Sequence, residues 1–210
     1  MKKFELTTEF ITNALGKKLF RIKALVEFGS VKAGELGGYA EKEENISQDG
    51  NAWVSGDARV YGDARVSGHA RVSDNARVSG HAWVSDNALV FGRALVFGDA
   101  KVSGRALVFG NARVSGDALI SGNARVSGDA WVSDNADYAL VQGFGIKFRC
   151  TTFYRGKNKK IMVNCGCFHG DLEEFRKQVK ETRSGKIAKE YLMIADLMKY
   201  HFASEDSSDE

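Results

Sequence analysis

The sequence predicts a mainly β protein built around a triangular parallel β-solenoid. Two observations support this fold class. From Asn51 to Asp134 the chain consists of fourteen consecutive six-residue units without one insertion, and a fixed short period is the signature of a repeat architecture. Each unit also alternates Ala and Val or Ile with variable residues, as a strand with one buried face does.

Residues 1–50 precede the repeat and are expected to form a β-hairpin cap. Phe20, Ile22 and Ala24 alternate with charged residues, and the same alternation continues through Val26 and Phe28. A solenoid needs such a cap because the backbone edge of its first coil would otherwise be open to further strand pairing.

Residues 51–136 form the solenoid itself. Within each unit the Ala and Val side chains point inward, and Gly or Asp followed by Asp, Asn, His or Arg supplies the bend at a corner. Six residues per side and three sides per coil give 18 residues per coil, so the 84 repeat residues make about 4.7 coils. The interior is filled by small aliphatic residues, and any function must therefore lie on the outside.

The spacing of an aliphatic residue and a small residue four positions later, as in Val54 and Ala58, resembles the hexapeptide-repeat superfamily of left-handed parallel β-helices. The resemblance implies a left-handed coil. Residues 31–39 and 44–54 also resemble the leader of uncharacterised bacterial and phage hexapeptide-repeat proteins that are often labelled transferases. The superfamily includes acyltransferases, binding proteins and structural proteins, so the fold alone does not specify a function.

Residues 18 positions apart stack on one face of the solenoid, and this sorting places six large apolar side chains on the outside. Burial of such a patch is favoured at about 25 cal/mol per Å², which indicates an interface. We predict a homo-oligomer, most simply a trimer about an axis parallel to the solenoid; the alternative is that the terminal parts of the same chain cover the patch. The predicted interface residues are Leu89, Phe91, Leu95, Phe97, Leu107 and Phe109.

A column of arginines on the second face is a candidate ligand site. Arg59, Arg77 and Arg113 share this column, with Tyr61 and Trp131 beside them. Guanidinium groups bind oxyanions and stack on aromatic rings, so the set suits phosphate or nucleobase contact. The alternative is a solvated face whose arginines are neutralised by aspartates at the corners.

Residues 137–202 are expected to form a small ββαα module. Residues 146–155 and 160–168 are predicted strands of a hairpin. Asp171 and Glu174 form a predicted capping box for a first helix, and a second helix begins near Lys186. Both helices are amphipathic and should cover the hairpin.

Cysteines and cations in the predicted hairpin suggest two further sites. Pairing Arg155 with Lys160 would place Cys150 opposite Cys165. Alternation along the strand would then place Cys167 and His169 on the same side. This set is a weak zinc candidate, and buried free thiols are the alternative; no metal or other cofactor is expected. Arg149 and Phe153, with Lys147 and Arg155, would form a small basic and aromatic surface suited to a nucleic acid. The weak zinc candidates are Cys150, Cys165, Cys167 and His169.

The composition indicates which segments are ordered and in which compartment the protein is expected. Residues 203–210 are acidic and almost without apolar side chains, so they are expected to be a disordered tail. No apolar run approaches the length of a membrane span, and three cysteines argue against a disulfide framework. We therefore expect a cytoplasmic protein without membrane contact.

We interpret the chain as a non-enzymatic binding protein. His69 and His81 occupy different corners of the repeat, and nothing in the sequence pairs a nucleophile with a base. The resemblance to phage proteins implies a phage-encoded protein in the host cytoplasm that sequesters a nucleotide-like signalling ligand or a host protein. Two alternatives stay open, an acyltransferase-like enzyme that uses acyl-CoA and a purely structural or polymerising solenoid.

Overall fold

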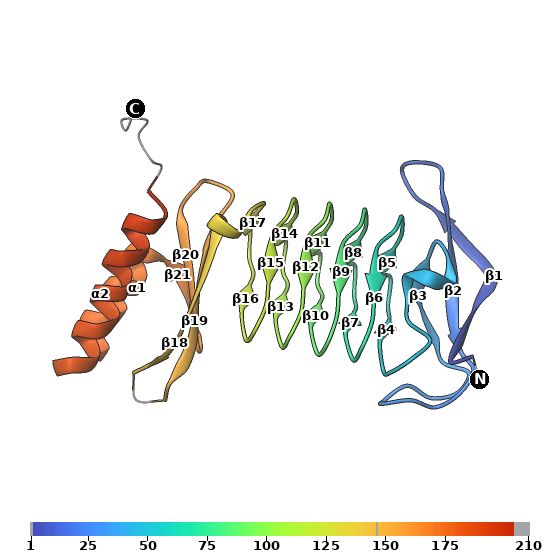
Figure 1. Ribbon diagram of the computed structural model, residues 1–210, viewed down its shortest axis with the longest axis horizontal. Coiled ribbons are helices and arrows are strands. Elements are labelled where there is room, and N and C mark those ends of the chain that lie inside the picture. The colour runs from blue at the N-terminus through green and yellow to red at the C-terminus, as the bar shows by residue number, and fades with distance from the viewer. Residues whose placement is uncertain (1, 146, 204–210) are drawn as a thin grey trace.

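A computed structural model describes residues 2–145 and 147–203. The solenoid forms the middle of an elongated molecule (Figure 1), with N-terminal strands at one end and a module of strands and helices at the other. Of the predicted acidic tail, residues 204–210 lie outside the described part, as does Ile146.

The repeat units form fourteen two-residue strands in three parallel sheets, one sheet for each face. Leu89 pairs with Leu107, so the coil advances by 18 residues per turn as predicted. The first face contains β4 (Trp53–Val54), β7 (Arg71–Val72), β10 (Leu89–Val90), β13 (Leu107–Val108) and β16 (Arg125–Val126). The second contains β5 (Arg59–Val60), β8 (Arg77–Val78), β11 (Leu95–Val96), β14 (Arg113–Val114) and β17 (Trp131–Val132). The third contains β6 (Arg65–Val66), β9 (Trp83–Val84), β12 (Lys101–Val102) and β15 (Leu119–Ile120).

The interior of the solenoid is packed with the predicted Ala and Val columns. In the strands from β4 to β17 the second residue is Val or Ile and is fully buried, and the Ala that precedes each strand is buried as well. Such small residues let the three sheets approach closely, and their packing removes apolar surface from water along the whole coil.

The corners use positive φ angles. Gly80 has φ 68°, and a Cβ at this position would lie 2.9 Å from the backbone nitrogen of Gly98 in the next coil, so only glycine fits without strain. Two corners carry aspartate instead, Asp74 at φ 60° and Asp86 at φ 58°.

The N-terminal cap is a three-stranded antiparallel sheet of β1 (Phe4–Thr12), β2 (Lys18–Ala24) and β3 (Leu36–Ala40), which is larger than the predicted hairpin. The predicted strand through Phe28 ends at Ala24. Phe28 instead turns back, and its ring and that of Phe4 both pack edge-on against Trp53, which is 1% exposed. These aromatic contacts, which no alternation pattern reveals, determine where β2 ends.

The solenoid geometry begins before the repeat sequence does. β3 pairs in parallel with β5, and after a short 3₁₀ turn, η1 (Glu43–Asn45), Ile46 bridges to Val66. The cap and the first coil are therefore joined by backbone pairing ahead of the predicted boundary at residue 51.

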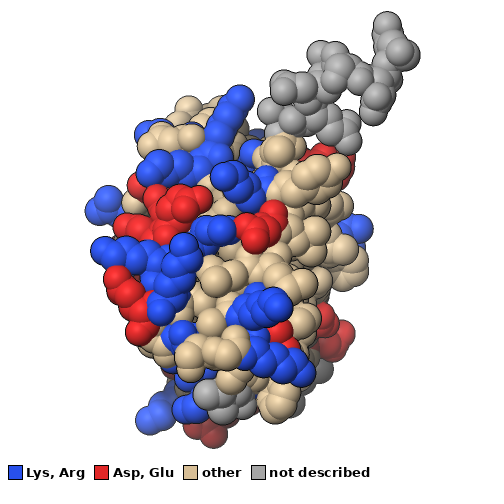
Figure 2. Space-filling view, turned by 90° about the vertical axis from the view of Figure 1, so that its left-hand side faces the viewer, with Lys and Arg blue, Asp and Glu red and all other residues tan. Residues whose placement is uncertain are grey.

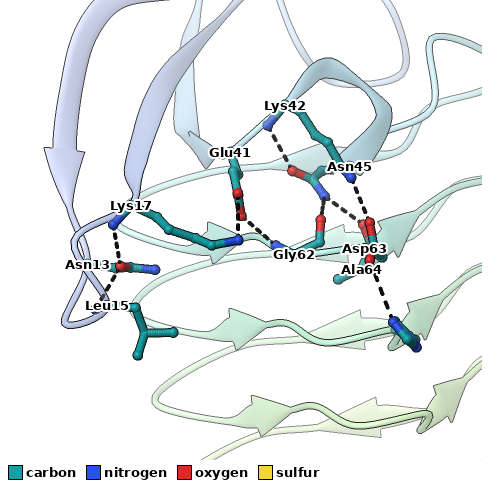
Figure 3. Close-up of polar contacts among 10 residues, drawn as sticks. Asn13, Leu15, Lys17, Glu41, Lys42, Asn45, Gly62, Asp63 and Ala64 are labelled. Atoms are coloured by element: carbon teal, nitrogen blue, oxygen red, sulfur yellow. Dashed lines mark hydrogen bonds and ion pairs between the residues drawn. The ribbon is translucent and has the colours of Figure 1, made fainter.

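Polar contacts strengthen this junction (Figure 3). Glu41 accepts hydrogen bonds from Lys17 Nζ at 2.8 Å and from the backbone N–H of Gly62 at 2.7 Å, and Asn45 Nδ2 donates to the carbonyls of Gly62 and Ala64. Burial by itself raises the pKa of Glu41, but the contacts with Lys17 and Gly62 outweigh it and hold that pKa below its ordinary value.

The C-terminal module has four strands where two were predicted. After η2 (Asn135–Asp137) the chain forms an antiparallel meander of β18 (Tyr138–Phe144), β19 (Arg149–Arg155), β20 (Ile161–Cys165) and β21 (Phe168–Asp171). Helices α1 (Leu172–Thr182) and α2 (Gly185–His201) follow, and the predicted capping box of Asp171 and Glu174 starts α1. The two predicted strands are β19 and β20.

The predicted register of this hairpin is wrong by one residue. Arg155 pairs with Ile161 rather than Lys160, and Cys165 lies opposite Thr151 rather than Cys150. The slip arises because Gly156 and Lys160 close a longer loop in which Lys159 adopts φ 59°. A shift of one residue reverses which side chains face each layer. Phe153 is therefore fully buried against Phe175 under the helices, and the predicted exposure of Phe153 is wrong.

The other face of β19 and β20 packs on the last coil. The backbone N–H of Arg125 donates to Thr152 Oγ1 at 2.9 Å, and Asn164 Nδ2 donates to the carbonyl of Arg125 at 2.8 Å. These side chains form hydrogen bonds with the backbone N–H and carbonyl at the edge of β16, with which a further coil would otherwise pair. The module therefore terminates the solenoid.

Candidate functional site

Two adjoining cavities, of about 690 and 330 Å³, meet where the last coil contacts the C-terminal module. They share Trp131 and Lys157, and we call them together the Trp131 groove. One part runs along the second face of the solenoid and the other lies beside the β19–β20 loop. The groove is lined by Arg93, Leu95, Asn111, Arg113, Asp129, Ala130, Trp131, Ser133, Asp137, Arg155, Gly156, Lys157, Lys159, Phe202 and Ala203.

Trp131 occupies the outward position of β17, the last strand of the repeat. Its side chain is 45% exposed, although indole is one of the largest apolar groups in proteins. Arg113 lies one coil earlier in the same column, with its guanidinium carbon 5.6 Å from the centre of a Trp131 ring. The repeat thus holds a cation and an aromatic face side by side on rigid backbone.

The β19–β20 loop supplies the opposite wall of the groove. The backbone N–H of Lys157 donates to the carbonyl of Asp129 at 2.9 Å, and Gly156 bridges to Ala130. These contacts fix the loop against a corner of the last coil. The side chain of Lys157 remains exposed and lines both cavities.

Arg155 has a structural role beside the groove. Its guanidinium contacts Asp137 at 3.0 Å, donates to the carbonyl of Phe202 at 2.9 Å and lies 5.5 Å from the centre of the Phe202 ring. These three contacts occupy much of its donor capacity. Arg155 therefore anchors Phe202, the residue that follows α2, to the wall of the groove.

The groove is basic. Five of its lining residues are Lys or Arg and two are Asp. Both aspartates are engaged, Asp137 with Arg155 and Asp129 with Asn111 Nδ2 at 3.1 Å. Arg93, Arg113, Lys157 and Lys159 are thus the cations available to an anion, and Trp131 offers a ring on which a flat group can stack.

The predicted ligand residues are divided among several places. Arg113 and Trp131 lie in the groove. Arg59, Arg77 and Tyr61 lie on the same face toward the N-terminal cap, and Leu95 separates Arg77 from Arg113 in the column. Arg149 lines a different cavity within the module.

Sequence reasoning missed Lys157, Lys159 and Phe202. The two lysines are in a polar loop between strands, and Phe202 follows α2. Nothing in the local pattern shows that the loop and the end of α2 meet the last coil. The only feature of the sequence that points to a binding role for this loop is its number of lysines.

The predicted apolar interface lies on the faces to which the 18-residue period assigned it. The rings of Phe91 and Phe109 stack in parallel with centres 4.9 Å apart, next to Leu89 and Leu107 on the first face. Phe97 is exposed, and the other five side chains of the set are half-buried. In Figure 1 the terminal strands and helices lie beyond the two ends of the solenoid, away from β10 and β13.

The four weak zinc candidates do not converge. Cys165 and Cys167 line the cavity beneath the helices, whereas His169 lies against Gly128 of the solenoid. Alternation along β19 directs Cys150 to the face opposite Thr151, and so away from Cys165. Within residues 2–145 and 147–203, no three His, Cys, Asp or Glu side chains are grouped to hold a metal ion.

His81 is an exposed side chain that lies between two carboxylates. Its Nδ1 lies 3.3 Å from Asp99 and its Nε2 lies 3.5 Å from Asp63, the equivalent corner residues of the next and the preceding coil. Both ring nitrogens thus face acceptors. This arrangement suits a hydrogen-bonded ladder along a corner better than a general base, which needs a nitrogen that faces the substrate.

Two comparisons bear on the family of the chain. The family model for the YdcK Beta solenoid repeat matches residues 52–68, 70–86 and 118–134, all within the solenoid. No curated protein matches the chain. In the part of the chain that the structure describes, no helix is long and apolar enough to cross a membrane. The matched segments and the coil of 18 residues per turn together identify this chain as a β-solenoid repeat protein.

Proposed function

We propose that this chain is a non-enzymatic binding protein whose Trp131 groove takes a nucleotide-like ligand. The observation that carries the proposal is Trp131 itself, a half-exposed indole with Arg113 at 5.6 Å on one side and Lys157 at the junction of two cavities. Stacking of a base on an aromatic side chain contributes about 1–3 kcal/mol, and the nearby cations suit a phosphate.

The size of the groove supports a ligand larger than a single phosphate. Its two parts, of about 690 and 330 Å³, fall in the range of small-molecule sites. Cations line both parts, so the groove can hold phosphate groups on either side of a base stacked on Trp131. A cytoplasmic protein with such a groove would sequester its ligand, and we propose this role in a phage-infected host.

We further propose that copies of the chain associate through the predicted interface residues, most simply as a trimer. The parallel stack of Phe91 and Phe109 and the leucines beside it form a partly exposed apolar surface on the side of the solenoid. Leu95 belongs to this surface and also lines the Trp131 groove. A neighbouring copy would therefore lie close to the bound ligand.

Membership of the hexapeptide-repeat superfamily, with a left-handed coil, belongs to the same proposal. The triangular section and the period of 18 residues support it.

An acyltransferase is less well supported because both ring nitrogens of His81 face carboxylates. A polymerising solenoid is less well supported because the cap and the module cover both ends of the coil. A host protein as the sequestered partner is the alternative occupant of the groove.

The proposal can be tested by titrating the full chain with AMP and ATP, measured by calorimetry. We expect binding of one of these probes and a loss of about tenfold or more in affinity for Trp131→Ala, because the stacking surface is removed. Lys157→Ala should weaken ATP more than AMP, since it removes a cation near the phosphates. The control is Trp83→Ala, a tryptophan of similar exposure (47%) on the third face that does not line the groove.

Equal affinity in Trp131→Ala and Trp83→Ala would contradict the proposal. Native mass spectrometry of protein purified from cells extends the test to ligands beyond these probes. A nucleotide that co-purifies with the natural chain and is lost from Trp131→Ala supports the proposal, and a protein partner that is lost instead supports the alternative.

A further inference from the structure

The C-terminal module contains a second cavity that the Trp131 groove does not explain. It has a volume of about 280 Å³, lies between the β20–β21 turn and the ends of the helices, and shares no lining residue with the groove. We call it the module cavity. Its lining residues are Lys147, Arg149, Cys165, Cys167, Phe168, Phe175, Gln178, Val179, Thr182, Arg183 and Tyr191.

Three cations face this cavity without a compensating carboxylate. Lys147, Arg149 and Arg183 line it, and no Asp or Glu does. Among the described residues, none of the three forms an ion pair. Other cations of the module are paired, as Lys160 is with Asp171 and Arg176 with Asp196. Figure 2 views this end of the molecule and shows Lys and Arg interspersed with Asp and Glu, so the cavity differs from the surface around it.

The helix ends do not cancel this charge. Gln178, Val179 and Thr182 belong to the last turns of α1, whose carbonyl end carries roughly half a negative charge. Part of that end is satisfied internally, since Arg183 Nη1 donates to the carbonyl of Thr182 at 2.9 Å. Three full positive charges outweigh half a negative one, and the cavity favours an anion.

The walls of the cavity are preformed. Gly166 has φ 64°, and the guanidinium of Arg149 lies over it, so closely that a Cβ at residue 166 would overlap Arg149 Nη1. Tyr191 is buried and donates its hydroxyl hydrogen to the carbonyl of Phe144 at 3.3 Å. Burial raises the pKa of Tyr191 above its ordinary value, which already lies well above neutral pH, so the hydroxyl is protonated there.

The floor of the cavity is apolar. Phe168, Phe175 and Val179 form it, with the rings of Phe168 and Phe175 5.4 Å apart. A bare inorganic ion would leave this surface in contact with water. A ligand that carries both an anionic group and a compact apolar group would use the cations and the floor together.

We propose that the module cavity binds a small organic phosphate, a phosphate monoester attached to a compact apolar group. Two guanidinium groups and an ammonium group match the charge of a phosphate monoester, which is about −1.5 to −2 near neutral pH, better than that of a single carboxylate. The volume of about 280 Å³ favours a ligand of the size of phenyl phosphate over a whole nucleotide.

The test uses phenyl phosphate as the probe and the full chain in calorimetry. We expect Arg149→Gln and Arg183→Gln each to weaken binding about tenfold or more, because each removes charge-assisted hydrogen bonds. Lys180→Gln is the matched control, an exposed cation on α1 that does not line the cavity. Inorganic phosphate should bind more weakly than phenyl phosphate, since it cannot use the floor.

The thiols provide a second readout that does not depend on a variant. Cys167 is exposed and lines the cavity, whereas Cys150 lies on the other face of β19. Bound phenyl phosphate should slow alkylation of Cys167 and leave that of Cys150 unchanged.

Three results would each overturn the proposal. Phenyl phosphate would fail to bind at about 10 mM, or Arg183→Gln and Lys180→Gln would bind it equally, or Cys167 would react at its free rate when phenyl phosphate is saturating. Trp131→Ala should not affect this binding, which separates it from the function proposed above.

Discussion

At the scale of single residues, two aspartates show how the solenoid tolerates departures from its repeat. Asp74 and Asp86 occupy corner positions at which most units have glycine, and both adopt a positive φ. The Asp74 carboxylate accepts the backbone N–H of Gly92 at 2.9 Å, and the Asp86 carboxylate does the same for Gly104. Each aspartate thus forms an additional hydrogen bond to the next coil, which offsets the strain of a left-handed conformation.

This explanation predicts different effects for two substitutions of one residue. Asp74→Ala keeps the strain and loses the hydrogen bond, so we expect the free energy of unfolding to fall by about 1–2 kcal/mol. Asp74→Gly also loses the hydrogen bond but removes the strain, and its effect should be within about 0.5 kcal/mol. Urea unfolding of both variants measures the difference. If alanine and glycine were equally tolerated, the carboxylate would not have this role.

At the scale of elements, one buried amide connects three strands at the junction between the solenoid and the module. Asn164 Nδ2 lies 2.8 Å from the carbonyl of Arg125, 3.0 Å from Ser127 Oγ and 3.1 Å from Tyr154 Oη. The same side chain therefore connects β20, β19 and β16. Burial raises the pKa of Tyr154 above its ordinary value, which already lies well above neutral pH, so the hydroxyl in this network is protonated.

We expect Asn164→Ala to loosen this junction. The carbonyl of Arg125 would lose its partner at a partly buried position, which costs up to about 1–3 kcal/mol. Hydrogen exchange should become faster in β18–β21 and in the last coil, while the first coils keep their protection. Asn158→Ala in the exposed β19–β20 loop is the control. Uniform exchange rates in the two variants would show that other contacts hold the module.

The elements also show what the sequence could predict. The fourteen strands of the repeat were predictable because each unit has the same pattern, and Ala and Val fill the same interior in every coil, whereas the parallel pairing of β3 ahead of residue 51 was not. The N-terminal cap and the C-terminal module have no repeating sequence period from which to predict their packing. The aromatic contacts of Phe28 with Trp53, the loop that shifts the β19–β20 register and the burial of Phe153 all depend on tertiary packing.

The candidate site divides in the same way. Arg113 and Trp131 belong to the repeat, and the period correctly placed them in one column. Lys157 reaches them only because the loop from Gly156 to Lys160 packs on a corner of the last coil. No spacing rule predicts such docking between a repeat and a module.

At the scale of the whole molecule, the proposed oligomer depends on surface that a single chain leaves partly exposed. Leu89 and Leu107 are paired neighbours at the centre of the apolar surface. Complete burial of a leucine contributes about 1.5–3 kcal/mol. A closed trimer would contain three copies of each contact, so small changes at these positions should have large effects on assembly.

We therefore expect Leu89→Glu combined with Leu107→Glu to yield a monomer. Two carboxylates per chain would enter an apolar interface without partners, and burial of an unpaired charge is strongly unfavourable. Light scattering should give the natural chain a mass of three times 23.0 kDa and the double variant 23.0 kDa. Leu119→Glu is the control, because Leu119 is similarly apolar and 43% exposed but lies on the third face. Circular dichroism of the double variant distinguishes loss of assembly from loss of folding, since the Ala and Val interior is unchanged. A natural chain that is monomeric at tens of micromolar, or a folded double variant that keeps the oligomeric mass, would contradict an interface on this face.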